Sequence, residues 1–493
     1  MNHLRLILIA VLLLVHPGVL RAAEPASPHA KPNIIYLLLD DAGYGDLGCY
    51  GQKTLLTPNV DRLASEGMKF TRHYSGATVC APSRCVLMTG LHTGHSRIRG
   101  NGPSHLPDTD LNVARLLKDA GYHTACIGKF GLGSPVPMDD PQKKGFDEFF
   151  GYVGTAHAHN FYTHFLVRNG KKESLDNQII PGSEKKPDTG VAKADGRKQW
   201  APQLLSDDVQ RYLEERAKDR SKPFFLQYSL NLPHANNEAG KTSPLGHGME
   251  TPGYGEFTSR DWPDVEKGFA SAMKFIDDEV GAVINQLDKL RLDENTIVML
   301  SSDNGPHSEG GHNAGFFQSS GGLNGIKRDL TDGGVRVPLL VRWPGKIKPS
   351  AVCEHVSGFQ DFLPTAADLA GVKVPAECDG ISFLPTLLGN NTQQKAHPYL
   401  CWYFDEAGGK RAVLKFPWKL IHLNTSSADE KSPTVQLFNL IRDPAESGNL
   451  VNAHPEIVEE LTGFMRQAWR EPIDDSAVSG NGKAHLNRTK STP

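Results

Sequence analysis

The chain has few cysteines and no excess of positive charge. Seven cysteines in 493 residues are too few to build a disulfide scaffold. Lysine and arginine number 53 against 56 aspartate and glutamate residues, which gives a formal net charge of −3. A protein that binds a nucleic acid backbone needs a basic field. We therefore expect no nucleic acid partner, and the length excludes a peptide hormone or a minimal binding module.

Long apolar runs are missing after the first residues, so we expect no membrane span. Residues 1–23 have the pattern of a secretory signal peptide, because a short apolar run over 6–15 ends at Pro17 and is followed by Ala22 and Ala23. A spanning helix needs about 20 apolar residues, which this run does not reach. We expect cleavage near Glu24 and export to the periplasm or the medium. An odd number of cysteines then leaves at least one thiol unpaired.

The order of apolar runs predicts an α/β fold. Continuous apolar runs are typical of strands buried on both faces, and they occupy residues 31–39, 122–127, 224–228, 296–300 and 337–341. Helical patterns lie between them, over residues 59–66, 111–120 and 263–290. Alternating strands and helices predict a mostly parallel central sheet flanked by helices. The 49 glycines and 33 prolines exceed average use, which indicates long ordered loops.

The pattern divides the mature chain into three parts. We expect a large α/β domain over residues 24–395, a small C-terminal α+β domain over 396–475 and a disordered tail over 476–493. Within the large domain, residues 167–200 are polar and rich in lysine, glycine and proline. We interpret that segment as a surface insertion.

Polar residues follow the predicted strands at the edge where an open α/β sheet binds ligands. Asp40 and Asp41 follow the first run, and Asp303 and Asn304 follow the fourth. Three carboxylates and an amide are hard oxygen ligands, which suit Ca²⁺ or Mg²⁺ and not zinc. An Asp-Asp pair that merely caps a turn is the alternative. Two such pairs on neighbouring strands favour a metal site.

A cysteine motif carries the most specific information. Cys80-Ala81-Pro82-Ser83-Arg84 is followed, after four intervening residues, by Thr89-Gly90. A cysteine four residues before an arginine is by itself compatible with a structural thiol. The whole string resembles the signature of the type I sulfatases of the alkaline phosphatase superfamily. The resemblance covers most of the mature chain, through NIIYLLLDDAGYGDLGCYG from residue 33, GKFGLG from 128, LPHA from 232, SSDNGPH from 301, KRDLTDGGVRVPLLVRWPG from 327 and LFNLIRDPAESGNL from 437.

This resemblance implies a formylglycine-dependent, arylsulfatase-like enzyme with its catalytic domain in residues 24–395. It implies that a maturation enzyme converts Cys80 to formylglycine, whose hydrated aldehyde is the nucleophile, and this conversion accounts for an unpaired cysteine. Other residues match family positions as follows: Asp40, Asp41, Asp303 and Asn304 as Ca²⁺ ligands, Arg84 and Lys129 as residues that hold the hydrated aldehyde, and His234 and Lys327 as residues that contact the sulfate and its leaving oxygen. Fixed cations suit sulfuryl transfer because negative charge spreads over the sulfate oxygens.

One position departs from the family pattern. Many relatives have Gly-Lys-Trp-His where this chain has Gly128-Lys129-Phe130-Gly131, so the histidine assigned to assist release of the sulfate is absent. His157 and His159 are candidates to replace it or to bind substrate, because residues two apart share one face of an extended segment. A solvated or structural role is the alternative for this pair. We also count His307, in SSDNGPH, among the substrate-binding candidates.

The substrate implied is a sulfate ester, and an exported enzyme of this kind suits a sulfated carbohydrate. The sequence leaves two alternatives open. One is a phosphodiesterase or phosphonate monoester hydrolase of the same superfamily, which shares the metal and nucleophile scaffold. The other is a protein that binds sulfated glycans without turnover, which would hold if Cys80 stayed unmodified.

Overall fold

A computed structural model describes residues 31–102, 105–134, 138–183, 189–239, 242–425 and 433–471. The predicted signal peptide over residues 1–23 and the predicted tail over 476–493 lie outside these ranges. No helix in the described ranges is long and apolar enough to cross a membrane.

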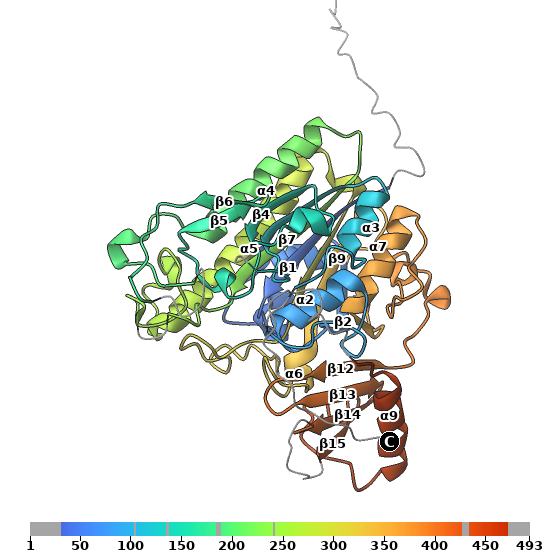
Figure 1. The fold of residues 1–493 in the computed structure, drawn as a ribbon. Coiled ribbons are helices and arrows are strands. Elements are labelled where there is room, and N and C mark those ends of the chain that lie inside the picture. Colours follow the sequence, from blue (N-terminus) through green and yellow to red (C-terminus); the bar gives the residue numbers. More distant parts are fainter. Residues whose placement is uncertain are drawn as a thin grey trace, which may run out of the picture. The chain divides into compact units, whose positions relative to one another are not determined.

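An eleven-stranded sheet runs through the described part of the large domain (Figure 1). Its central strands are parallel and lie in the order β8 (Thr296–Ser302), β1 (Asn33–Asp40), β7 (Phe224–Pro233), β3 (His123–Lys129) and β4 (Glu148–Tyr152). The flanking strands are β9 (Arg336–Arg342), β2 (Met68–Tyr74), β10 (Ala351–Cys353) and β11 (Ser357–Gly358) on one side and β5 (Phe165–Arg168) and β6 (Lys171–Ser174) on the other. The predicted mostly parallel sheet is confirmed.

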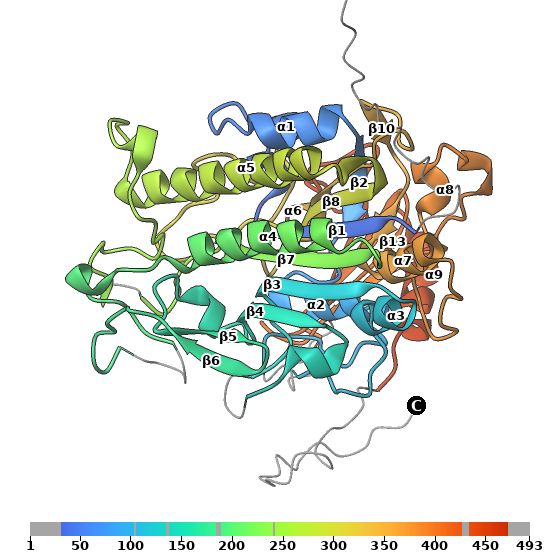
Figure 2. The ribbon, with the colours of Figure 1, turned by 90° about the horizontal axis from the view of Figure 1, so that it is seen from above.

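Helices cover both faces of this sheet (Figure 2). The side chains of β1 show which helices pack on each face. Ile35, Leu37 and Leu39 point to one face, where they pack against helices α1 (Pro58–Ser65), α4 (Ala201–Lys218) and α5 (Asp264–Leu290). Their neighbours Ile34, Tyr36 and Leu38 point to the other face, which is covered by α2 (Cys80–Thr89), α3 (Val113–Asp119) and α7 (Phe362–Ala370). Successive strand side chains alternate between faces, so a strand buried on both faces has to be apolar throughout.

A second, antiparallel sheet forms the C-terminal region. It contains β12 (Leu400–Phe404), β13 (Lys410–Lys415), β14 (Trp418–Leu423) and β15 (Thr434–Asn439), and helix α9 (Pro455–Gln467) packs against it. Lys419 joins this sheet to the large domain, because its fully buried ammonium lies 2.8 Å from Asp332 in helix α6 (Asp332–Val335) and 3.1 Å from Glu446. The predicted small α+β unit is present, while its boundary at residue 396 stays a prediction.

The sequence interpretation was wrong about residues 167–200. This segment is not only a surface insertion, since Val167 belongs to β5 and is buried, as are Ala192 and Trp200. The misleading feature was β6, whose four residues are all exposed because the strand lies at the edge of the sheet. Polar edge strands have the composition of loops, so composition alone did not separate the two.

Candidate active site

The pairing of β1 with β8 brings the acidic residues together. Leu39 is opposite Ser302, and the backbone N–H of Asp303 donates to the Leu39 carbonyl at 3.0 Å, so Asp40 and Asp303 follow the same edge. Asp41 has a φ of 66°, a left-handed conformation that is uncommon outside glycine. Its backbone N–H donates to Asp303 Oδ1 at 3.1 Å, and its Oδ1 accepts from Asn304 Nδ2 at 2.7 Å. The four predicted ligand residues therefore form one buried group.

These residues fit a divalent cation. Asp40 Oδ1 and Asn304 Oδ1 are buried, and no hydrogen-bond donor of the described residues reaches either oxygen. A buried acceptor without a partner is costly, and a cation would satisfy both oxygens at once. Burial raises the pKa of the Asp303 carboxyl, and the charge of Asp40 raises it further. A buried group of three carboxylates and one amide, which offers only oxygen ligands, suits a hard cation.

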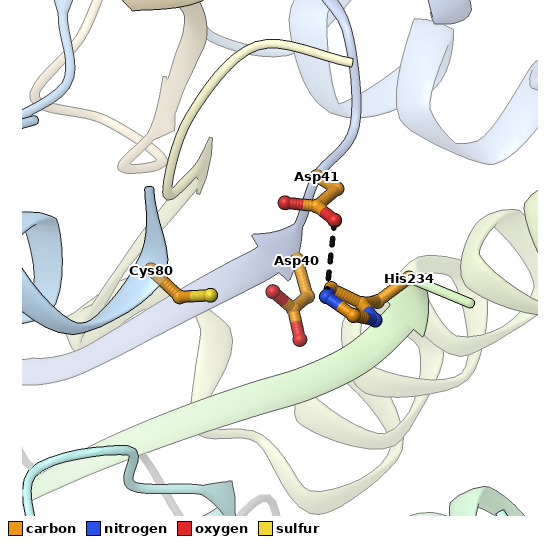
Figure 3. A group of neighbouring side chains, drawn as sticks. All are labelled: Asp40, Asp41, Cys80 and His234. Atoms are coloured by element: carbon orange, nitrogen blue, oxygen red, sulfur yellow. Dashed lines mark ion pairs between the residues drawn. The ribbon is translucent and has the colours of Figure 1, made fainter. Parts of the chain in front are cut away.

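Cys80 faces the carboxylates from the first turn of α2. Figure 3 shows its side chain turned toward Asp40, with Asp41 and His234 beyond. The potential ligand atoms of these four residues all lie within 4.8 Å of one another, and all four residues are buried. Burial raises the pKa of the Cys80 thiol. The helix begins here because Val79 is extended and it ends at Gly90, whose φ of 71° suits a glycine C-cap.

Arg84 and Lys129 supply positive charge from two further elements. Arg84 Nε donates to Asp303 Oδ2 at 2.9 Å, and Lys129 Nζ donates to Asp40 Oδ2 at 2.7 Å. The guanidinium also donates to the Lys129 carbonyl at 2.5 Å, which ties α2 to the end of β3. Burial alone would raise the pKa of Asp40, but the charges of Lys129 and Arg84 outweigh it and hold that pKa below its usual range. The two basic residues therefore lie beside the carboxylates, and their predicted role toward position 80 stays a prediction.

Lys327 and His234 form the other side of the group. Lys327 Nζ donates to Asp41 Oδ2 at 2.8 Å and to His234 Nε2 at 3.1 Å. His234 Nδ1 lies 2.6 Å from the Ala235 carbonyl, so Nδ1 carries the proton and Nε2 accepts from the ammonium. Burial, with the charge of Lys327, lowers the pKa of His234 well below its usual value. The lysine therefore holds the proton, and the histidine is a neutral acceptor.

Glu309 is a member of the site that the sequence interpretation missed. Its Oε2 accepts from Lys327 Nζ at 2.8 Å and from Asn237 Nδ2 at 2.8 Å, and its Oε1 accepts from Arg328. The charge of Lys327 overcomes the effect of burial and holds the pKa of Glu309 below its usual range. The sequence feature that pointed to Glu309 was its position two residues after His307, which is the last residue of the SSDNGPH segment.

The two paired histidines separate in the structure. Residues His157–His159 form a 3-10 turn, so the expectation that they share the face of an extended segment is wrong. His157 Nε2 lies 3.1 Å from Thr163 Oγ1, and its ring stacks on Phe165 within the core. His159 instead stacks on His234, with ring centres 4.2 Å apart, and its Nδ1 lies 3.0 Å from Glu238. Only His159 thus contacts the catalytic candidates.

His307 lies beside the site but has both ring nitrogens engaged. Nε2 lies 3.0 Å from the Pro233 carbonyl, and Nδ1 accepts the backbone N–H of Glu309 at 3.1 Å. Burial lowers the pKa of His307 to about 4, so the ring is neutral. Its bonds join the end of β7 to the loop that carries Glu309, which is a supporting arrangement.

The surroundings of Gly131 leave little room for a side chain at this position. Its φ is 77°, and a Cβ built there would lie 3.0 Å from Arg84 Cδ and 3.5 Å from Thr155 Cγ2. The Arg84 side chain fills the space that a side chain at position 131 would enter. A side chain at position 131 would therefore contact Arg84 first.

A comparison of the sequence with models of known protein families agrees with this arrangement of side chains. The model of the sulfatase family matches residues 32–372, which include every member of the group described above. The chain belongs to the sulfatase family. A second model, N-sulphoglucosamine sulphohydrolase, C-terminal, matches residues 325–471 of the sulfatase. The protein is a sulfuric ester hydrolase.

Individual relatives cover nearly the whole chain. The sulfatase is 29% identical to N-acetylgalactosamine-6-sulfatase of Canis lupus familiaris over 92% of this chain and 87% of the relative. It is 30% identical to arylsulfatase A of Bos taurus over 90% and 87%. The crystal structure of Ps i-CgsB in complex with k-i-k-neocarrahexaose is similar with a TM-score of 0.72 and 25% identity, over 90% of this chain and 94% of that one.

We predict that Gly131→Ala lowers both stability and turnover of the sulfatase. The left-handed backbone costs about 1 to 2 kcal/mol for a residue with a Cβ, and the contact with Arg84 displaces the guanidinium. A small displacement of a catalytic group lowers kcat by about 10- to 100-fold. The measurements are thermal unfolding and kcat on a small aryl sulfate.

The matched control is Gly371→Ala. Gly371 has a φ of 65° and nothing within 4 Å of a built Cβ, so it carries the same backbone cost without a contact. This control is expected to lower the unfolding midpoint and to leave kcat unchanged. Equal kcat values for the two variants would contradict a role of position 131 in placing Arg84.

Proposed function

We propose that the protein is an exported sulfatase that removes sulfate from a sulfated carbohydrate, with a formylglycine at position 80 and a bound Ca²⁺. The observation that carries this proposal is the convergence of Cys80, at the start of α2, on four buried oxygen donors and three basic side chains. A thiol with a raised pKa is a poor nucleophile, which favours conversion of Cys80 over direct attack by a thiolate.

Conversion of Cys80 fits the donor set. The hydrated aldehyde would supply a hydroxyl nucleophile beside the carboxylates, and it would replace the sulfur of the group by oxygen. Asp40, Asp41, Asp303 and Asn304 would hold Ca²⁺, whose charge lowers the energy of a sulfate group that gains negative charge during transfer. The orphan oxygens of Asp40 and Asn304 support this assignment.

The chain's own cations have separate tasks in this proposal. Lys129 and Arg84 pair with Asp40 and Asp303, and from there they would hold the hydrated aldehyde at position 80. Lys327 is the proton-bearing group next to His234, so this pair is placed to bind the sulfate and to protonate the leaving oxygen. Fixed donors of this kind stabilise charge that develops in the transition state.

The polar rim beside Lys327 supports a carbohydrate substrate. Glu309, Asn237, Arg328 and His159 offer both donors and acceptors, which are the groups that bind sugar hydroxyls. N-acetylgalactosamine-6-sulfatase and a structure in complex with neocarrahexaose are among the similar proteins. Sulfated galactose or N-acetylgalactosamine units are therefore the first substrates to test.

Export and maturation belong to the same proposal. The pattern of residues 1–23 supports export to the periplasm or the medium. A formylglycine-generating or other maturation enzyme is then a required partner. All seven cysteines are free, so Cys80 is not held in a disulfide.

We predict that Cys80→Ala abolishes turnover and leaves folding intact, because the nucleophile is lost. Cys80→Ser retains one hydroxyl, which can accept the sulfate but cannot release it by forming an aldehyde. This variant is therefore expected to accumulate a sulfated serine, detected as a mass increase of the peptide that contains position 80. Retention of more than about a thousandth of the activity by Cys80→Ala would contradict a nucleophilic role.

We predict that a calcium chelator lowers both the unfolding midpoint and the activity, because a bound ion stabilises the folded state. Asp303→Asn is expected to remove the calcium-dependent shift of the midpoint and to lose bound calcium in elemental analysis. Asp277→Asn is the control, since Asp277 is a buried carboxylate that binds backbone N–H groups of α1 instead. Retention of calcium by Asp303→Asn would overturn the assignment. So would recovery of the unfolding midpoint and the activity of the chelated protein with Mg²⁺ alone.

We predict that His159→Ala lowers kcat/KM on a sulfated oligosaccharide more than on a small aryl sulfate, because only the glycan fills the rim. A panel of defined sulfated mono- and oligosaccharides, run beside the matching phosphate esters, identifies the natural substrate. Equal losses on both substrates would assign His159 to the chemical step. Faster turnover of the phosphate esters would contradict a sulfatase.

A further inference from the structure

The carboxamide of Asn101 contacts the side chain at position 80. Its Nδ2 lies 3.8 Å from Cys80 Sγ, within the range of an N–H···S hydrogen bond, and its Oδ1 accepts the backbone N–H of Ala81 at 3.0 Å. Asn101 lies in the irregular segment that follows α2, outside the motifs that carry the family resemblance. One amide thus touches both the nucleophile position and the start of its helix.

The start of α2 fixes the orientation of this amide. The first N–H groups of a helix have no partner within the helix, and Val79 at the N-cap provides no side-chain acceptor. The Ala81 N–H can only donate, so it requires the oxygen of the Asn101 amide. With its oxygen committed to Ala81, the amide has to direct its NH₂ toward Cys80.

Glu406 holds Asn101 in place from the C-terminal sheet. The Asn101 backbone N–H donates to Glu406 Oε1, and a Cβ at Gly100 would lie 2.9 Å from the same oxygen. Glu406 belongs to the turn over residues 405–409 between β12 and β13. From the end of the same turn, Lys410 Nζ donates to the Arg328 carbonyl at 2.7 Å, next to Lys327. The hairpin therefore contacts the segments on both sides of the site.

We propose that Asn101 is a further catalytic residue of this sulfatase, which donates a hydrogen bond to the reacting group at position 80, and that Glu406 is its positioning residue. The proposal rests on the proposed conversion of Cys80, because an oxygen at that position accepts from an amide more strongly than sulfur does. An amide cannot take up a proton at neutral pH. Asn101 therefore acts as a hydrogen-bond donor. It does not replace the histidine that is absent at position 131.

The experiment uses the full-length protein and distinguishes the role of the Asn101 NH₂ group from that of its amide oxygen. Asn101→Asp keeps the acceptor for Ala81 and removes the donor, whereas Asn101→Leu removes both at similar size. The readouts are kcat and KM on a small aryl sulfate, the midpoint of thermal unfolding, and the mass of the peptide that contains position 80. Asn112→Ala is the matched control, because Asn112 caps α3 through the N–H groups of Ala114 and Arg115 outside the site.

The expected result is a loss of kcat of about 100-fold for both Asn101 variants, in the range found for removal of one transition-state donor. The unfolding midpoint is expected to fall for Asn101→Leu and to stay close to the parent value for Asn101→Asp. Asn112→Ala is expected to lower the midpoint with kcat unchanged. KM is expected to stay unchanged, since the cations that bind sulfate are untouched.

Glu406 is tested by rescue. Glu406→Ala is expected to lower kcat at least about 10-fold, and Glu406→Gln is expected to restore it, because the amide oxygen still accepts the Asn101 N–H. A kcat of Asn101→Asp within about threefold of the parent would overturn the proposal and leave Asn101 as a helix cap. Unconverted Cys80 in the active parent enzyme would instead refute the proposed function, and the peptide mass distinguishes the two failures.

Discussion

The structure depends on the neutralisation of three carboxylates that are buried side by side. Asp40, Asp41 and Asp303 follow two adjacent strands, and an isolated buried charge costs several kcal/mol. Arg84 from α2, Lys129 from β3 and Lys327 from a loop each pair with one of them or with two. Because these cations come from separate elements, the same electrostatic requirement that forms the site also fixes how α2, β3 and the loop lie against β1.

The sequence predicted the parts of this arrangement that follow from periodicity and strand ends. The apolar run before Asp40 predicts a strand buried on both faces, and the second run before Asp303 predicts its neighbour, whose register places the two acids together. Asn101 and Glu309 could not be predicted in this way. Their contacts depend on irregular loops that have no repeat, and the partner of Asn101 lies 305 residues away in the chain.

The histidine pair shows a different limit of sequence interpretation. Two residues that are two apart share a face only in extended backbone. In a 3-10 turn, with three residues per turn, their side chains point about 120° apart. His157 therefore enters the core while His159 reaches His234. The direction of the His157 ring depends on its packing against Phe165 in the core, which the sequence pattern does not reveal.

The buried Lys419 also has a consequence for the order in which the parts of the protein can fold. A chain is made from its N-terminus, so every residue from Asp40 to Lys327 leaves the ribosome before Lys419 does. Until Lys419 is made, Asp332, in the α6 segment that leads into β9, lacks its buried ammonium partner. The growing chain thus contains all the catalytic residues before it has its final structure. Cys80 is fully buried in the folded protein, so the conversion proposed for it would have to precede that final structure.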